Sequence, residues 1–272
     1  MITFQEKLIT AATTNRSLVC VGLDIDISRI PCSDPLEFCR QIIDATSEFV
    51  CSYKPNLAFF EMMGTEGWEL LDQVIKMVPP GIPVIGGGKI GDIGSTASAY
   101  AKALFEKLNF DAVTINPYMG QDSVEPFIAY EDKGIFILCK TSNQGSEDFQ
   151  DLITSAGKPL YMVVAEKAQD WNRNDNIGLV VGATYPEELK RIRHSCPDMP
   201  ILIPGIGAQG GTLNEAVQFG SDKSGRGAII NSSRAILYAS AGPDFAASAR
   251  EAARSLRDQI NSILHENSCD WS

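Results

Sequence analysis

The sequence predicts a (β/α)8 TIM barrel, in which eight parallel strands alternate with helices. Short apolar runs rich in β-branched residues recur between helical segments along the chain. These runs are continuous rather than alternating with polar residues, which is typical of strands covered on both faces. Eight strand-and-helix units in 272 residues also match the size of this barrel. A doubly wound open sheet is the competing architecture.

The expected elements follow one another with no break that separates domains. The predicted strands are residues 18–23, 50–55, 82–88, 111–116, 134–139, 177–182, 200–204 and 227–231. The predicted helices are residues 35–48, 65–77, 95–107, 186–196, 212–219 and 245–264. No Pro/Ser-rich linker or low-complexity tract divides the chain, so we expect a single barrel domain over residues 1–272.

The charge of the chain argues against polyanionic partners. Lys and Arg number 23 and Asp and Glu 34, which gives a net charge of −11. This charge repels nucleic acids and acidic membranes, so an anionic ligand requires a local cationic pocket. No apolar run approaches the roughly 18 residues that cross a bilayer, and the first seven residues lack a signal-peptide pattern. We therefore expect neither a nucleic-acid partner nor a membrane partner.

Cysteine and histidine usage narrows the compartment and the chemistry. The seven cysteines are scattered and form no CxxC pair, which favours reduced thiols and a cytoplasmic protein. The only two histidines, His194 and His265, fall in helices that are predicted to lie at the surface. This argues against a metal held by histidines and against a Ser-His-Asp triad.

Polar residues stand at the carboxyl ends of most predicted strands. Such ends converge on one mouth of a barrel, where barrel enzymes carry out their chemistry. The candidates are Asp24 (first strand), Lys54 and Asn56 (second), Lys89 and Asp92 (third), Ser142 and Asn143 (fifth), and Ser232, Ser233 and Arg234 (eighth), and the segment 205–211 follows the seventh strand. Any one of these residues alone is explained as an ordinary loop residue, whereas their joint position at the strand ends favours an active site.

The segment 86–96 is the most informative part of this pattern. It places Lys89 and Asp92 three residues apart, between a predicted strand and a predicted helix. A lysine and a carboxylate at such a position form a charged pair where α/β enzymes place their chemistry. A plain ion pair at the start of a helix is the alternative explanation.

An anion site is predicted at the ends of the last two strands. Residues 204–211 are rich in glycine and offer closely spaced backbone N–H groups, and Arg234 begins the helix that follows the eighth strand. Barrels commonly bind phosphate with the loops after these two strands. We expect residues 212–226 to form a mobile loop that closes over the phosphate.

Seven motifs together resemble the orotidine 5′-phosphate decarboxylase family, in particular its longer bacterial subgroup. They are VGLD (21–24), YKPNLAFFE (53–61), KIGDIGST (89–96), NPYMG (116–120), CKTSN (139–143), PGIGAQGG (204–211) and NSSR (231–234). The resemblance extends from the first strand to the eighth, and no single motif accounts for it. It implies a homodimeric (β/α)8 barrel that converts orotidine 5′-monophosphate to UMP and carbon dioxide without a metal or an organic cofactor.

The resemblance also implies a role for each matching residue. Asp24 and Lys54, assisted by Thr96, are expected to hold the ribose hydroxyls, and Lys89 is expected to protonate C6. The remaining expected contacts are Asn56 and Asn143 in the substrate site, Ser142 at the pyrimidine, Gln209 from ring to phosphate, and Arg234 at the phosphate with Pro204, Gly207 and Ser233 around it. Asp92, Ile93 and Thr96 are expected to enter the site of the partner subunit.

One position departs from the family pattern Asp-x-Lys-x-x-Asp. The first acid of that pattern falls on Gly87, which removes a negative charge beside the expected proton donor. At ~5 Å and an effective dielectric constant of about 20, one charge pair contributes roughly 3 kcal/mol. Such a loss corresponds to a rate factor on the order of 10² if it acts only in the transition state.

Three explanations of Gly87 stand side by side. The acid was replaced in an impaired enzyme that retains substrate, or a natural homologue has shifted chemistry, or Asp92 or Glu61 compensates in another register. Two alternative functions also stay open. One is a nucleotide-phosphate-binding barrel without catalysis, and the other is a barrel acting on a 3-keto-hexulose or pentulose phosphate, which usually requires a metal.

Overall fold

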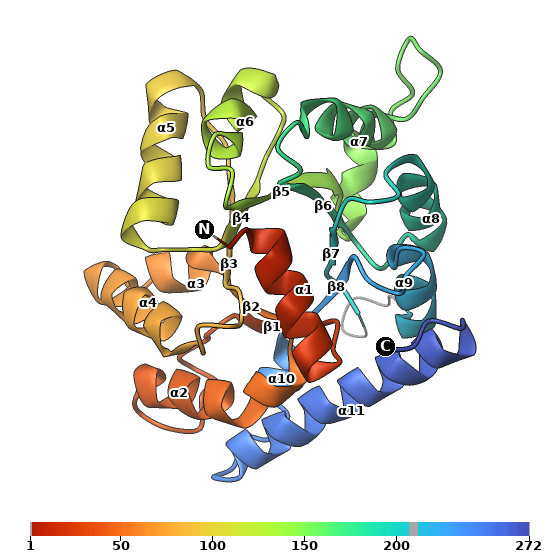
Figure 1. The fold of residues 1–272 in the computed structure, drawn as a ribbon. Helices are drawn as coiled ribbons and strands as arrows, with labels where there is room; N and C mark the ends of the chain where they lie inside the picture. The colour runs from red at the N-terminus through yellow and green to blue at the C-terminus, as the bar shows by residue number, and fades with distance from the viewer. Residues whose placement is uncertain (1, 207–211, 272) are drawn as a thin grey trace.

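The computed structural model, which describes residues 2–206 and 212–271, is a ring of eight parallel strands with helices around it (Figure 1). The strand order is β2-β1-β8-β7-β6-β5-β4-β3. Its two ends approach each other through a parallel bridge between Tyr53 and Val84 and a hydrogen bond from the Tyr53 N–H to the Pro83 carbonyl at 3.0 Å. The predicted barrel is confirmed, and the open doubly wound sheet was the wrong alternative.

All eight predicted strands are present, and most begin one to three residues later than expected. They are β1 Val19–Leu23, β2 Ser52–Pro55, β3 Ile85–Ile90, β4 Ala112–Ile115, β5 Gly134–Lys140, β6 Ile177–Val181, β7 Ile201–Ile203 and β8 Ala228–Ser232. One boundary matters for function. Lys89, which was expected after the third strand, lies inside β3, because the strand continues beyond a shift of register against β4.

The six predicted helices are also present. The helices are α1 Phe4–Asn15, α2 Pro35–Thr46, α3 Leu57–Glu61, α4 Thr65–Met77, α5 Gly94–Lys102, α6 Gln121–Ile128, α7 Leu160–Trp171, α8 Pro186–Ser195, α9 Leu213–Gly220, α10 Arg234–Leu237 and α11 Phe245–Glu266. Short 3₁₀ turns (Ser47–Phe49 and Gln144–Asp148) and a π-helical turn (Ala103–Lys107) complete the set. None of the described helices is both long and apolar enough to span a bilayer.

Two predictions overlapped at residues 212–226: the helix over 212–219 is confirmed as α9, and the mobile loop over the whole segment is wrong. Most of it is helix α9, and the remaining residues connect α9 to the start of β8. Because all strands are parallel, the start of β8 lies at the end of the barrel opposite the strand termini. An amphipathic helix that packs against β7 and β8 explains the apolar residues of this segment better than a mobile loop does.

The amino-terminal helix α1 lies across one end of the barrel (Figure 1). Its buried residues Phe4 and Leu8 join an interior cluster with Phe136 of β5, and the rings of Phe4 and Phe136 meet edge to face at 5.6 Å. Gly134 makes room for this contact, since a Cβ atom there would lie 2.4 Å from the Phe4 ring. A Thr3–Glu6 capping box begins the helix.

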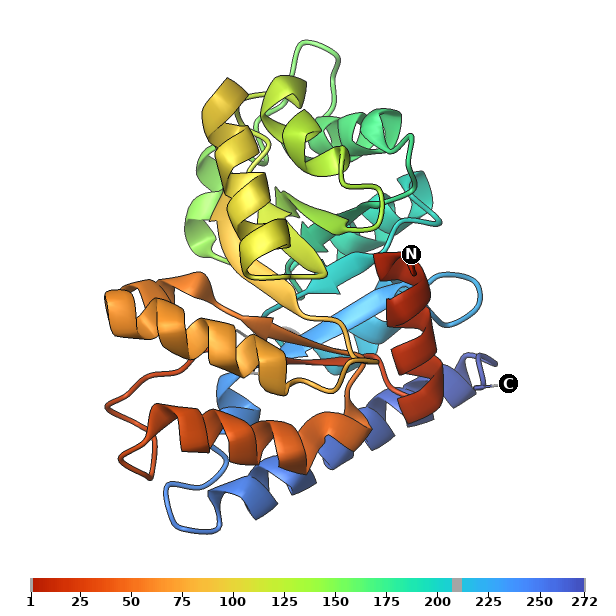
Figure 2. The same cartoon turned by 60° about the vertical axis from the view of Figure 1, so that its left-hand side comes forward.

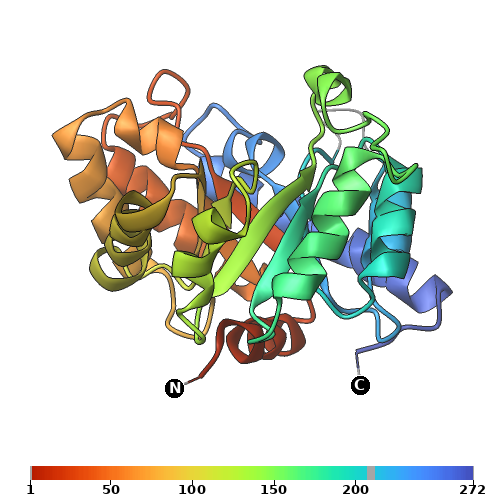
Figure 3. The same ribbon diagram turned by 90° about the horizontal axis from the view of Figure 1, so that it is seen from above.

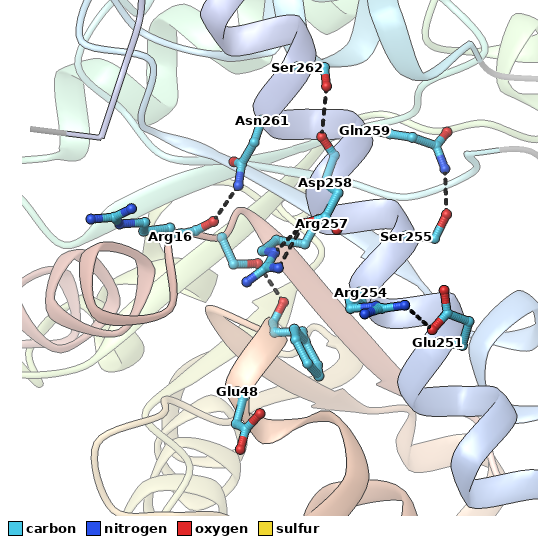
Figure 4. A network of polar contacts seen from close by, with 12 residues as sticks. Arg16, Glu48, Glu251, Arg254, Ser255, Arg257, Asp258, Gln259, Asn261 and Ser262 are labelled. Atoms are coloured by element: carbon cyan, nitrogen blue, oxygen red, sulfur yellow. Dashed lines mark hydrogen bonds and ion pairs between the residues drawn. The ribbon is translucent and has the colours of Figure 1, made fainter.

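The carboxyl-terminal helix α11 is tethered to the same end. It packs along α2 and α9, and the Asn261 side-chain amide donates a hydrogen bond to the Arg16 carbonyl at 3.0 Å (Figure 4). Both chain termini therefore lie at the end that α1 covers (Figures 2 and 3). The opposite end, where the strands terminate, is left to the loops that form the pocket.

Replacing Phe136 with alanine is expected to lower the free energy of unfolding by about 3–5 kcal/mol, because the fully buried ring leaves a cavity at the centre of the barrel. The matched control is Phe149→Ala, whose side chain is 63% exposed, and its effect is expected within about 0.5 kcal/mol. Urea denaturation followed by circular dichroism measures both. Equal effects of the two substitutions would contradict this account of the interior.

Candidate active site

A cavity of about 370 Å³ opens at the carboxyl ends of the strands. Eleven of the residues predicted from the sequence line it: Asp24, Lys54, Asn56, Gly87, Lys89, Ser142, Asn143, Pro204, Ser232, Ser233 and Arg234. The barrel brings them together because each stands at or just beyond the end of a parallel strand. The cavity lies within the range of volumes typical of small-molecule sites.

The other predicted residues are not part of this lining. Asp92, Ile93 and Thr96 lie between β3 and the first turn of α5, outside the cavity of their own chain. Gly207 and Gln209 lie outside the described residues. Glu61, the proposed compensating acid, is exposed at the end of α3 and does not line the cavity either.

Several residues that line the cavity were not predicted from the sequence. Thr114, Thr141 and Asn231 add polar groups, and Leu138, Val180, Leu202 and Ile206 form apolar wall. Asn231 stands near the end of β8, so the rule that found Ser233 and Arg234 was sufficient to find it as well. Thr114 lies within a continuous apolar strand, where the sequence gives no sign of which side chains face inward.

Lys89 is held in an unusual backbone conformation. Its φ angle is 50°, in the left-handed region that a non-glycine residue enters at a cost of roughly 1 kcal/mol. The Thr114 hydroxyl accepts a hydrogen bond from the Lys89 N–H at 3.0 Å and donates one to the Gly86 carbonyl at 3.4 Å. Thr114 therefore anchors β3 on both sides of the register shift and fixes the direction of Lys89.

The three glycines before Lys89 have different surroundings. A Cβ atom at Gly86 would lie 3.2 Å from the Phe110 ring, and one at Gly88 would lie 2.7 Å from Leu57. Gly87 instead faces the cavity, where a Cβ atom would lie 3.4 Å from the Lys54 amine and 3.0 Å from the Pro55 carbonyl. An acidic side chain at this position would thus reach Lys54, at the cost of a small shift of Pro55.

Two lysines share the cavity without a carboxylate bonded to either. Among the described residues, neither the Lys54 amine nor the Lys89 amine forms a salt bridge or a hydrogen bond. The cavity walls displace water and lower the pKa of Lys89, the charge of Lys54 lowers this pKa further, and Asp24 opposes both effects. Solvent still reaches the Lys89 side chain through the mouth.

Asp24 is placed by a tyrosine that directly follows helix α10. The Tyr238 hydroxyl donates to the Asp24 carbonyl at 2.9 Å and accepts from the Asp26 N–H at 2.8 Å. The buried Oδ1 atom of Asp24 has no hydrogen-bond partner in the part of the chain that the structure describes. A buried acceptor without a partner is costly, so this oxygen is suited to a ligand with hydroxyl groups.

The cavity lining includes a group that suits an anion. Arg234 lines the cavity together with Ser233 and Gly205, whose φ of 98° favours glycine. A guanidinium is suited to an anion such as a phosphate. The described residues contain no group of three or more His, Cys, Asp or Glu side chains arranged to hold a metal.

Comparisons with known proteins agree with one another. The model of the orotidine 5′-phosphate decarboxylase / HUMPS family matches residues 17–251. Orotidine 5′-phosphate decarboxylase of Dehalococcoides mccartyi is 56% identical over 262 residues, which cover 95% of this chain and 97% of that protein. The Roseiflexus sp. enzyme is 50% identical over 270 residues, with coverage of 97% and 99%. The structure of Leishmania donovani OMP decarboxylase superposes with a TM-score of 0.86 at 44% identity, covering 96% and 98%.

Replacing Lys54 with methionine is expected to raise the pKa of Lys89, because it removes the neighbouring positive charge and leaves Asp24 in place. NMR of reductively ¹³C-methylated lysines measures this pKa directly. The control is Lys223→Met, since Lys223 lies before β8 at the opposite end of the barrel. A Lys89 pKa that is unchanged or lower in the Lys54 variant would show that the two amines do not interact.

Proposed function

Because the chain belongs to the orotidine 5′-phosphate decarboxylase family and is a carboxy-lyase, we propose that this cavity decarboxylates orotidine 5′-monophosphate with Lys89 as proton donor. The observation that supports this assignment is the joint placement of Lys54, Lys89 and Arg234 around one cavity. Lys89 suits a reacting carboxylate, Lys54 suits ribose hydroxyls, and Arg234 suits a phosphate. The pathway context is the formation of UMP in pyrimidine biosynthesis.

The proposed reaction requires stabilisation of a carbanion. When the bond between C6 and the carboxylate breaks, the electron pair stays on C6 and carbon dioxide leaves. The Lys89 ammonium stabilises this developing charge and then transfers a proton to C6. Solvent returns a proton to the amine. The lowered pKa of Lys89 favours the transfer, since a more acidic ammonium gives up its proton more readily. The steps use only side chains of the protein, so no metal or organic cofactor is required.

The rest of the ligand is assigned by complementary chemistry. The carboxylate oxygen of Asp24 that has no partner in the described chain accepts a hydrogen bond from a ribose hydroxyl. Lys54 binds the same sugar, and Thr96 of the partner subunit assists. Arg234 binds the phosphate beside Ser233 and Pro204. Ser142 contacts the pyrimidine ring, with Asn56 and Asn143 nearby on the cavity wall. Gln209 and Gly207 keep the roles that the family resemblance gives them.

We propose that Gly87 makes this chain a slow decarboxylase that retains its substrate. With no acid at position 87, the substrate carboxylate meets the positive field of Lys89 and the nearby Lys54 and no opposing negative charge at this position. The bound substrate is then stabilised more than the transition state, in which the carboxylate charge moves to C6. Binding is tight and turnover is slow.

Restoring the acid with Gly87→Asp is expected to raise kcat on the order of 10²-fold, because it restores one charge pair at ~5 Å. The size-matched control is Gly87→Asn, which brings the same steric contact with Pro55 but no charge. Stopped-flow decay of orotidine 5′-monophosphate absorbance measures the rate. An unchanged rate in Gly87→Asp would reject the impaired-enzyme explanation, and the absence of any UMP in a single turnover would reject catalysis altogether.

The pH dependence of activity is expected to differ between Gly87→Asp and Gly87→Asn. Since Lys89 acts as an acid, activity falls as pH rises through its pKa, which lies below that of an ordinary lysine. An added carboxylate raises the pKa of Lys89. The alkaline limb of the profile for Gly87→Asp is therefore expected at higher pH than for Gly87→Asn.

We propose a cytoplasmic homodimer in which Asp92, Ile93 and Thr96 enter the partner's site. Ile93 is 53% exposed and Tyr118 is 83% exposed, and both stand at the starts of helices that pack together, α5 and α6. Met119 lies close to the segment between β3 and α5, since a Cβ atom at Gly91 would be 3.4 Å from its methyl group. Exposed apolar side chains at such a place favour burial against another protein.

Mixed dimers test the shared site. In the Gly87→Asp background, Lys89→Met and Asp92→Asn are each expected to be inactive, because every site lacks one of the two groups. Mixing the two variants under exchange conditions is expected to restore roughly a quarter of the parent activity, since half of the dimers then hold one complete site. Activity that stays at the average of the two variants would show that Asp92 serves its own chain or none.

A further inference from the structure

A lysine outside the cavity is completely buried. Lys140 is the last residue of β5, and its side chain is 0% exposed. Its amine bonds both carboxylate oxygens of Asp151, at 2.8 and 2.9 Å, and donates to the Ser146 hydroxyl at 3.0 Å. The amine also lies 4.1 Å from the centre of the Tyr185 ring. All of its bonding capacity is used within the protein.

Stability alone does not explain this ion pair. Removing an ammonium from water costs several kcal/mol, and an apolar side chain of similar volume often serves a core as well or better. Such pairs are instead suited to fixing one geometry among several, because only one arrangement satisfies all partners. Lys140 is therefore expected to fix the geometry of the segment around it.

The segment after Lys140 is tied to the same residues. The Thr141 N–H donates to the Gln150 side-chain carbonyl at 2.8 Å, and the Gln150 side-chain amide returns a bond to the Thr141 hydroxyl at 2.9 Å. The chain from residue 144 to 151 thus folds back onto residues 140–143. Gln150 and Asp151 are neighbours, so the Lys140 ion pair and the Thr141 bonds hold one another in place.

Ser142 lies between this fold and β6. A Cβ atom at Gly182 would be 2.7 Å from the Ser142 Cβ and 2.8 Å from its N atom, so the two backbones are in direct contact. The Thr184 hydroxyl donates to the Ser142 carbonyl at 3.3 Å. With β6 on one side and the segment 144–151 on the other, Ser142 has little freedom within the cavity wall.

We propose that Lys140 is a positioning residue, which acts through Asp151 and Thr141 to hold Ser142 against the pyrimidine of the ligand. This inference rests on the nucleotide ligand of the proposed function. Under this proposal, different strands contact different parts of the ligand. The ribose and phosphate meet Asp24, Lys54 and Arg234, which belong to other strands, whereas the ring meets the end of β5.

The test compares two ligands by isothermal titration calorimetry. Lys140→Met is expected to weaken UMP binding on the order of 10-fold, the effect of one misplaced polar contact, while ribose 5-phosphate binds as before. The matched control is Lys158→Met, which removes an exposed ion pair with Glu166 at 2.6 Å near the same segment. It is expected to leave both affinities unchanged.

A double-mutant cycle ties the effect to Ser142. In a Ser142→Ala background, Lys140→Met is expected to have no further effect on UMP binding. Equal losses for UMP and ribose 5-phosphate, or additive effects of the two substitutions, would overturn the proposal in favour of general loosening. If Lys140→Met fails to fold, Asp151→Asn, which keeps the shape and one acceptor, decides between the same outcomes. An unmodified chain that fails to bind UMP would instead reject the proposed function.

Discussion

The interaction on which the site depends is the repulsion between the Lys54 and Lys89 ammonium groups in one cavity. Two like charges in one cavity raise the free energy of the protein, and Asp24 opposes their effect on Lys89. The barrel withstands this because β2 and β3 are fixed by the ring closure around them. The left-handed backbone of Lys89 adds a second unfavourable contribution at the same place. A ligand carboxylate relieves the first of these, which favours binding.

The two ends of the barrel have different roles: one contributes stability and the other forms the cavity. At the end covered by α1, the rings of Phe4 and Phe136 and the apolar residues around them fill the interior. At the other end, the interior ends in polar and charged side chains around an open cavity. Burial at the first end contributes the stability that tolerates unpaired polar atoms and backbone strain at the second. This division explains why so few site residues contribute to the core.

The sequence predicted most of the cavity-lining residues that mark the end of an apolar run, and it did not predict those that lie within such a run. Asp24, Lys54 and Arg234 mark the boundaries of apolar runs, so position alone identified them. The exact end of β3 was missed, because a register shift and a left-handed residue leave no signal in a run of glycines. Thr114 was missed since it lies within an apolar strand. The mobile loop over residues 212–226 was a wrong prediction, because the polar residues 221–225 form only the end of this segment and the apolar spacing before them belongs to α9.

Lys140 and Lys89 show how position within a barrel decides the use of a lysine. Lys140 does not line the cavity; Asp151 neutralises its ammonium, and Ser146 and the Tyr185 ring contact it. Such an ammonium has no bonding capacity left for a substrate, so its effect is limited to geometry. Lys89 faces the cavity with no bonded partner in the described chain and a lowered pKa, so its proton is available. An acid at position 87 would lie beside the Lys54 amine and add a negative charge to the cavity, while Lys89 would stay open to the ligand. In the proposed reaction, the substrate carboxylate, rather than an acid at position 87, supplies the missing negative charge. This charge moves to C6 as neutral carbon dioxide leaves, so the contacts that stabilise the carboxylate of the bound substrate are lost in the step that breaks its bond.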